Sequence, residues 1–346
     1  MDVSFRFYRA GDEERIARLF EGVFGRSVPA EAWRWKLAER PGGMERAILA
    51  EEDGEAVFHV GGIPCPAVVD GRPATVMVAV DAMTRADRRR RGLLTEGYRR
   101  LFERWREQGV ALVLGLPNEQ AGTDTRGWRP LFPLRWRVRF LRPERTLARK
   151  ARLPWLARGA PVGRLWNAAW DLRFLAPTDL VVEEEAPTAS QAAALWARCR
   201  PAFRHGLVRD AAWFRWRYVE APGRTYRFLR ARRGEGVEGV LCFRIQEDAG
   251  RSVGYLAEVL APADAGEVEE ALVRRMVDVA REAGCELVAA LAPEGSRREK
   301  LLARAGFLRS WGAFTVSCVP LGEGLRVEAL GDPRGWSLEG GCFDVV

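Results

Sequence analysis

The sequence predicts an α/β (α+β) protein in which one fold occurs twice, each copy a mixed, mostly antiparallel central sheet flanked by helices. Two observations lead to this prediction. The first half alternates a strand, a helix, several strands, a long helix and a further strand, and the second half repeats this order. In addition, Trp35 to Gly42 and Trp216 to Gly223 share Trp, a base, Glu, Pro and Gly in register. Self-similarity of this kind favours a duplication.

The elements of the first half are read from the period of their apolar residues. Residues 3–8 alternate as a strand does, and residues 12–24 place apolar side chains on one helical face behind Asp12 as a cap. The turn signals Asp53-Gly54 and Asp70-Gly71 then separate further strands. The remaining elements are expected as strands at 46–51, 56–63 and 74–83, a helix at 92–108 and a strand at 110–116.

The domain organisation follows from where the repeat ends and begins. We expect an N-terminal domain at 1–145, a connector at 146–180 and a C-terminal domain at 181–346. The connector is rich in Arg, Pro, Gly and Trp and contains one short helix near residues 165–174. In each domain one apolar strand carries a single acid, Asp81 in the first and Glu258 in the second.

Composition restricts the class of protein. A chain of 346 residues with 47% hydrophobic residues is long enough for two globular cores. It has no apolar run of membrane-spanning length and no signal-like start, so we expect a cytoplasmic protein. Six dispersed cysteines without a CxxC pair, and only two histidines, indicate reduced thiols and predict neither a disulfide framework nor a bound metal.

The net charge of +8 is concentrated in one segment. Residues 126–173 contain thirteen Arg or Lys against Glu144 and Asp171, together with five Trp, and the rest of the chain is slightly acidic. Such a segment could contact nucleic acid or an anionic membrane surface, or its arginines could line a domain interface or stay solvated. Because no nucleic-acid-binding motif is present, we expect no nucleic-acid partner and at most weak contact with an anionic surface.

The most informative local signal is an Arg-rich turn between a strand and a helix. Residues 84–94 read TRADRRRRGLL, with Gly92 at the start of the predicted helix. Such a turn offers backbone N–H groups, the positive end of the helix dipole and guanidinium groups to an anion such as a pyrophosphate. The alternative is an ordinary solvated run of charge.

These residues give the chain a resemblance to the GNAT superfamily of N-acetyltransferases. Arg89 to Leu94 matches the family's cofactor loop, Gln/Arg-x-x-Gly-x-Gly/Ala, except that Leu94 stands at the sixth position. Downstream, Asn118 and Ala121 match its Asn-x-x-Ala pattern. The chain is similar over nearly its whole length to a tandem subgroup, which has Asp-x-Met-Thr before the Arg-rich loop and Pro-Asn followed by Gly-Trp after it.

The resemblance implies an acetyl-CoA-dependent N-acetyltransferase that acts on an unidentified amine, either a small molecule or a peptide. It also implies the site residues. The pantetheine arm would lie along Ala82, Met83 and Thr84, and Asn118 would lie near the thioester as a catalytic and cofactor-contacting residue. The pyrophosphate would be held by Arg89, Arg90, Arg91, Gly92, Leu93 and Leu94.

Acyl transfer to an amine needs a group that accepts the ammonium proton. Asp81 is the candidate base, because it interrupts an apolar strand, although the matching Glu258 in the other copy also allows a structural role. His59 is an alternative base, or a hydrogen-bonded core residue. The family's Tyr acid has no counterpart between Asn118 and Trp128.

The second copy lacks the Arg-rich loop. Glu267, Glu269 and Glu270 stand in its place and would repel a pyrophosphate, so this copy is expected not to bind acetyl-CoA. Two other functions stay open: a non-catalytic module that binds acyl-CoA, nucleic acid or a membrane surface, and an aminoacyl transferase of cell-envelope assembly. The sequence does not reveal the acceptor or the oligomeric state.

Overall fold

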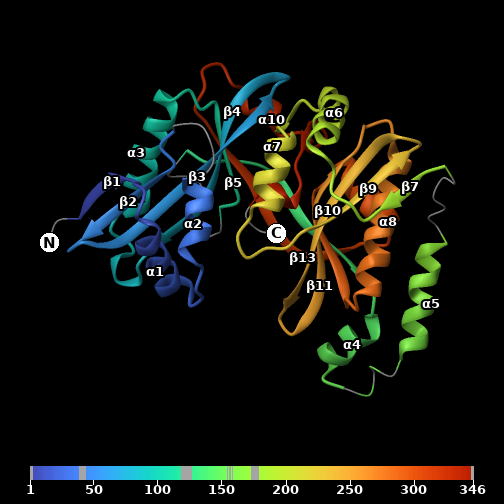
Figure 1. Ribbon diagram of the computed structural model, residues 1–346. Coiled ribbons are helices and arrows are strands. Elements are labelled where there is room, and N and C mark those ends of the chain that lie inside the picture. Colours follow the sequence, from blue (N-terminus) through green and yellow to red (C-terminus); the bar gives the residue numbers. More distant parts are fainter. Residues whose placement is uncertain are drawn as a thin grey trace.

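A computed structural model describes residues 3–38, 44–117, 127–153, 155, 157, 159–172 and 179–343. Its strands form one extended sheet with helices on both faces, which Figure 1 shows as two similar lobes side by side. The first lobe contains β1 (Ser4–Phe7), α1 (Glu13–Phe24), α2 (Ala30–Leu37), β2 (Ala47–Glu52), β3 (Glu55–Val69), β4 (Arg72–Thr84), α3 (Leu93–Glu107) and β5 (Leu112–Gly115), followed by β6 (Arg129–Phe140).

Two helices, α4 (Pro143–Ala151) and α5 (Ala160–Asp171), connect the lobes. The second lobe contains β7 (Val181–Glu183), α6 (Ala189–Cys199), β8 (His205–Leu207), α7 (Ala211–Phe214) with a π-helical turn at Arg215–Val219, β9 (Arg227–Arg233), β10 (Gly236–Asp248), β11 (Arg251–Leu260), α8 (Gly266–Glu282), β12 (Leu287–Pro293), α9 (Arg297–Arg304) and β13 (Leu308–Pro320). A C-terminal segment follows with α10 (Val327–Leu330), β14 (Trp336–Ser337) and a 3-10 turn at Gly340–Cys342.

The two halves of the sheet have equivalent strand orders, each counted from its outer edge toward the centre. It runs β1-β2-β3-β4-β5-β13-β6-β12-β11-β10-β9-β7. The first five strands on the β1 side correspond in chain order to β7, β9, β10, β11 and β12 on the other side. At the centre the last strands are exchanged, because β13 lies beside β5 and β6 lies beside β12. The expected mixed, mostly antiparallel sheet flanked by helices is confirmed, and the two sheets join into one.

The hairpin between β3 and β4 is longer than the sequence predicted. The two turns predicted from sequence are present, with Asp53 and Asp70 at φ 52° and Gly54 and Gly71 at 80° and 75°, the left-handed geometry of tight hairpins. Between Gly61 and Ala67, however, β3 pairs only with β4. Proline is tolerated at a free edge, so Pro64 and Pro66 do not end the strand.

Apolar residues fill both faces of the sheet. One cluster lies under α3 and a second lies under α1 and α2, while the second lobe packs α8 and α9 over its own cluster. A central cluster spans both lobes and contains Trp35 and Trp216. All six cysteines are free and buried.

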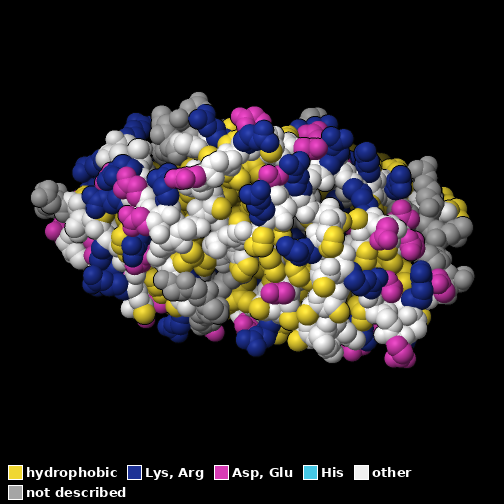
Figure 2. Space-filling model, turned by 90° about the horizontal axis from the view of Figure 1, so that it is seen from above, with side chains coloured by type: hydrophobic (Ala, Val, Ile, Leu, Met, Phe, Trp, Pro, Cys, Tyr) yellow, Lys and Arg dark blue, Asp and Glu magenta, His cyan; other side chains and the backbone are white. Residues whose placement is uncertain are grey.

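The molecular surface carries mixed charge. On the face shown in Figure 2, basic and acidic side chains are interspersed, and apolar side chains show between them near the middle. Among the described helices, none has both the length and the apolar character needed to cross a bilayer.

Candidate functional site

The candidate site begins at a bulge in β4. Between the pairs Gly61–Val80 and His59–Met83, β4 contains one residue more than β3. At this point Asp81 has a φ of 54°, a left-handed conformation that Asp adopts more readily than most residues. A bulge bends its strand and redirects the side chains around it.

Just before the bulge, β4 separates from β5. The two strands are parallel, but Val76–Val78 pair with Leu112–Leu114 and the pairing stops there. β5 ends at Gly115, whereas β4 continues to Thr84 with β3 on one side and, in the described part of the chain, no strand on the other. This free edge can bind an extended ligand through its backbone N–H and C=O groups, as sheet edges bind peptides.

The free edge of β4 leads directly into the N-terminus of α3. The helix begins after Gly92, which has φ 77° and provides no side-chain cap. The N–H groups of Leu93 and Leu94 belong to the first turn, where helical N–H groups lack an intrahelical acceptor. The Leu93 side chain is buried and that of Leu94 packs against the same cluster, so both residues present only their backbone at this end.

The arginines of the turn divide into two groups. Arg85 and Arg88 bind the carboxylates of Glu52 and Asp87, and these guanidinium groups hold the pKa of Glu52 below its usual range. These two side chains therefore fasten the turn to β2. A solvated run of charge would not do this.

Arg89, Arg90 and Arg91 are exposed. Arg89 Nε donates to the Thr84 carbonyl oxygen at 3.3 Å, so the turn folds back over the end of β4. Arg90 has a φ of 62°. Within the described residues none of the three forms an ion pair, which leaves their charges available to an anion at the α3 N-terminus.

The Asp81 carboxylate is paired with a lysine that the sequence analysis did not single out. Lys36 Nζ of α2 lies 2.9 Å from Asp81 Oδ2, and the two side chains are 7% and 15% exposed. Lys36 also lies over the ring of Trp33, 4.9 Å from its centroid. Lys36 is the basic residue of the repeated octamer. Its place in that repeat was the sequence signal that could have identified it.

His59 faces the same bulge from β3. Its Nδ1 lies 2.9 Å from the Asp81 carbonyl oxygen, and its ring packs edge-on against Trp33. The side chain is fully buried, and burial lowers its pKa. The structure therefore places His59 as a neutral core residue that supports the backbone of the bulge.

The structure brings most of the predicted site residues together. Ala82 is exposed, Met83 is buried under α1 and α2, and Thr84 ends β4 next to the turn. Asn118 lies outside the described residues. Tyr98 of α3 packs against Phe102 and Trp128. No group of three or more His, Cys, Asp and Glu side chains suited to a metal ion occurs in the described part of the chain.

The second lobe repeats the bulge but closes the space beside it. β11 pairs with β12 only over Val253–Leu256, and its register with β10 shifts next to Glu258. The C-terminal turn at Gly340–Cys342 packs against both strands. In this lobe the chain's own C-terminal segment lies where β11 leaves β12.

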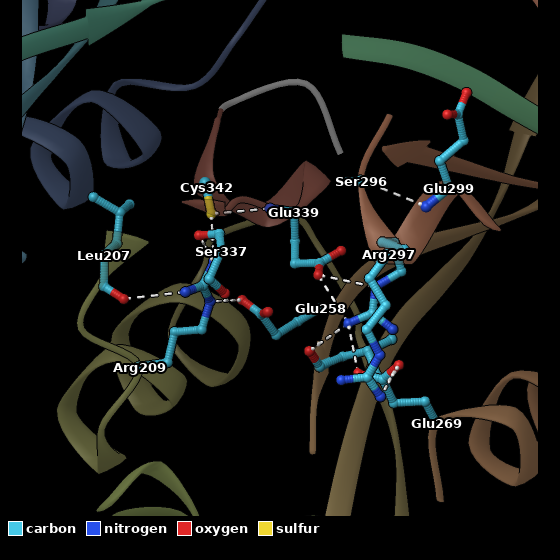
Figure 3. A network of polar contacts seen from close by, with 12 residues as sticks. Leu207, Arg209, Glu258, Glu269, Ser296, Arg297, Glu299, Ser337, Glu339 and Cys342 are labelled. Carbon is cyan, nitrogen blue, oxygen red and sulfur yellow. Dashed lines mark hydrogen bonds and ion pairs between the residues drawn. The ribbon is translucent and has the colours of Figure 1, made fainter. Parts of the chain in front are cut away.

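A buried polar network holds that segment in place (Figure 3). Arg209 Nε donates to Glu258 Oε2 at 2.8 Å, and its Nη2 donates to the Ser337 carbonyl oxygen at 2.8 Å. Arg298 pairs with Glu339 at 3.0 Å. Burial raises the pKa of Glu339 to about 7. Glu258 is thus fully buried, in contrast to Asp81.

The start of α8 differs from the start of α3 as the sequence predicted. Acidic Glu267 and Glu269 occupy its first turn. Glu269 is buried and contacts Arg297 and Arg298, so this helix end has its own internal partners.

Comparisons with known proteins match part of the chain by sequence and nearly all of it by structure. Residues 4–131 match the family model described as "Acetyltransferase (GNAT) domain". No curated protein matches the sequence.

Solved structures resemble the chain over nearly its whole length at low identity. A probable N-acyltransferase from Enterococcus faecalis has a TM-score of 0.67 at 10% identity, covering 93% of this chain and 74% of its own. Saccharomyces cerevisiae N-myristoyltransferase with bound myristoyl-CoA has 0.63 at 13%, covering 92% and 82%. Eis1 from Mycobacterium abscessus has 0.58 at 15%, covering 92% and 74%.

These likenesses agree with the fold, and the family match covers the bulged strand, the Arg-rich turn and α3. Residues 4–131 therefore carry a GNAT acetyltransferase domain, and over the rest of the chain the solved structures show a likeness of fold.

Proposed function

We propose that the protein is an acetyl-CoA-dependent N-acetyltransferase that binds the acyl donor in the first lobe. The observation that carries this proposal is the continuity of three features: the free edge of β4 after Val78, the uncapped start of α3 at Gly92, and the exposed arginines 89–91 between them, which form no ion pair within the described residues. A long ligand with amide groups in one part and phosphates at one end matches this arrangement.

In this proposal the backbone of Ala82, Met83 and Thr84 binds the amide groups of the pantetheine arm. The N–H groups of Leu93 and Leu94 and the guanidinium groups of Arg89 and Arg91 bind the pyrophosphate, because a helix N-terminus and arginine both favour an anion. Acetyl-CoA supplies an activated acyl group as a thioester.

Asp81 provides a negative charge beside this edge. Its carboxylate attracts the ammonium group of an acceptor and receives the proton that must leave before the amine can attack, directly or through a water molecule. Lys36 orients the carboxylate from α2. Because Lys36 is paired with Asp81, we assign it a positioning role.

We further propose that the chain arose by duplication, with domains at 1–145 and 181–346 around the 146–180 connector. The equivalent strand orders of the two halves of the sheet support this division. The C-terminal segment in the second lobe supports a single donor site in each chain. Because all six thiols are free, we place the activity in the cytoplasm, where thiols stay reduced.

The test is a thermal shift of the intact protein with acetyl-CoA. Ligand that binds only the folded state raises the melting temperature. Arg89→Glu combined with Arg91→Glu should abolish this rise, while Arg106→Glu, an exposed arginine at the other end of α3, should leave it intact. Absence of any shift in the unmodified protein would contradict the proposal.

The length of the acyl chain needs its own comparison. One structural neighbour contains myristoyl-CoA, so acetyl-CoA, myristoyl-CoA and free CoA should be measured side by side. Equal shifts with all three would show recognition of the CoA moiety alone. A release assay for CoA thiol with a panel of amines would then identify the acceptor.

A further inference from the structure

The helical hairpin α4–α5 lies at the end of the molecule away from α1, α2 and α3 (Figure 1). One face of α5 is anchored to the protein. Asn167 Nδ2 donates to the carbonyl oxygen of Leu141, outside the helix, at 2.9 Å. Asp171 pairs with Arg281 at 3.1 Å. The Trp170 ring lies against Gly306, where a Cβ atom would approach it to 2.8 Å.

The opposite face of α5 is apolar and exposed. Leu165, Ala168, Ala169 and Leu172 follow the i, i+3, i+4, i+7 spacing of one helical face. Leu165 is 72% exposed and Leu172 is 77% exposed, and Trp166 beside them is 39% exposed. A surface helix of a globular protein normally turns this stripe toward the core, so α5 has the opposite arrangement.

The segment before α5 has the same character. Leu147 is 58% exposed, Leu153 is 43% exposed and Trp155 is 61% exposed. Six of the ten large apolar side chains that the described surface exposes thus belong to this hairpin. Clustered apolar exposure of this kind indicates a surface that meets a partner.

The charges on the hairpin indicate the kind of partner. Arg145, Lys150, Arg152 and Arg164 are exposed and form no ion pair within the described residues. The two acids of the hairpin, Glu144 and Asp171, are partly buried, and a Cβ at Gly163 would lie 2.2 Å from Glu144 Oε2. The exposed charge of the described hairpin is therefore entirely positive.

We propose that the α4–α5 hairpin docks the protein onto an anionic lipid surface. Its six exposed leucine and tryptophan side chains would enter the boundary between headgroups and acyl chains, and its exposed Arg and Lys side chains would contact the lipid phosphates. A nucleic-acid surface offers nothing to the exposed Leu165 and Leu172 side chains, and for this reason the apolar stripe favours lipid. The inference is independent of the donor site in the first lobe.

The experiment is flotation of the full-length protein with vesicles of phosphatidylcholine and with vesicles that also contain phosphatidylserine. The protein should float with the anionic vesicles, less so in high salt because salt screens the Arg–phosphate attraction. Leu165→Glu and Leu172→Glu should each lower the bound fraction by roughly tenfold. Both side chains are exposed, so the fold should tolerate these changes.

A matched control tests whether vesicle binding depends on the hairpin or on any exposed apolar side chain. Val219, which is 64% exposed in the second lobe, changed to Glu should float as the unmodified protein does. The thermal shift with acetyl-CoA should be unaffected by Leu165→Glu. The proposal is overturned if neither vesicle binds, if Leu165→Glu and Val219→Glu behave alike, or if the hairpin variants lose binding to a DNA duplex and not to vesicles.

Discussion

The indole rings of Trp35 and Trp216 stack on each other at the junction of the two lobes. Their centroids are 4.6 Å apart and their planes differ by 15°. Trp35 Nε1 donates to the Trp216 carbonyl oxygen at 3.0 Å, and Trp216 Nε1 donates to the Trp35 carbonyl oxygen at 3.3 Å. The first residue of each repeated octamer thus binds its counterpart reciprocally, as a two-fold axis requires. The repeat in the sequence marks the contact that joins the lobes.

This pair should couple the stability of the two lobes. Trp35→Ala and Trp216→Ala should each cost about 3–5 kcal/mol of unfolding free energy. Their combination should cost less than the sum by about 1 kcal/mol or more, because the second change removes a ring that has already lost its partner. Urea unfolding of the single and double variants measures this. Trp105, a buried residue of α3, provides the control, since Trp35→Ala and Trp105→Ala should add without coupling.

The repeat could be predicted from the sequence because it rests on local patterns. Features that depend on contacts between distant segments could not be predicted in this way. The strand β6 was not predicted from the alternating arginines Arg135, Arg137 and Arg139. In the structure these side chains pair with Glu294, Glu299 and Asp171 of other elements, so they line an interface between segments, as one of the alternatives held. Such partners cannot be read from periodicity.

The candidate site was predictable to a similar extent. The turn from Arg89 to Leu94 and the bulged strand with Asp81 are continuous in sequence, and their residue types already indicated an anion site. The partner of Asp81, Lys36, lies 45 residues away. The C-terminal segment that fills the second lobe comes from the end of the chain, far from Glu258. The first contact depends on how α2 packs against β4, and the second depends on where the chain runs after β13. No local pattern reports either contact.

The buried Glu339 should make stability depend on pH. Its pKa in the folded protein is about 7, raised chiefly by burial above the ordinary value of 4.5. Between pH 4.5 and 7 the folded state therefore keeps a proton that the unfolded chain has lost. The stability that this proton provides is fully present below pH 4.5 and is lost as the pH rises through 7. The unmodified protein should lose about 1–3 kcal/mol relative to Glu339→Gln across this window.

Urea unfolding of both proteins at pH 5, 6, 7 and 8 tests this expectation. The amide of Glu339→Gln keeps the shape of the side chain and does not titrate, so the difference between the two curves isolates this group. Parallel curves across the four pH values would show that Glu339 ionises as readily in the folded protein as in the unfolded chain.

Gly97 should determine how closely α3 approaches the sheet. A Cβ atom there would lie 2.3 Å from Phe58 Cε1, and Phe58 is fully buried. Gly97→Ala should therefore destabilise the protein by about 1–3 kcal/mol, despite the better helix propensity of Ala. It should also weaken the acetyl-CoA thermal shift, because α3 carries the proposed phosphate site.

Gly22 in α1 is the matched control for this change. It lies in a helix with nothing within 4 Å of its Cβ position, so Gly22→Ala should stabilise the protein by about 0.5–1 kcal/mol. If the two variants shift the urea midpoint in the same direction, the close approach of α3 to Phe58 does not limit stability.

Substitutions in the ion pair between Lys36 and Asp81 should lower the rate of acetyl transfer without weakening the binding of acetyl-CoA. Asp81→Asn removes the negative charge that we propose receives the acceptor's proton, and we expect acetyl transfer to fall by about 100-fold. Because the proposed pyrophosphate site lies at α3, the thermal shift with acetyl-CoA should persist. Lys36→Met leaves the carboxylate without its cation and should lower transfer less, since Asp81 itself remains. Asp70→Asn removes an exposed acid that pairs with Arg204 and should change neither quantity. If Asp81 served only to hold α2 against β4, then Asp81→Asn and Lys36→Met would destabilise the fold equally and reduce transfer by the same factor.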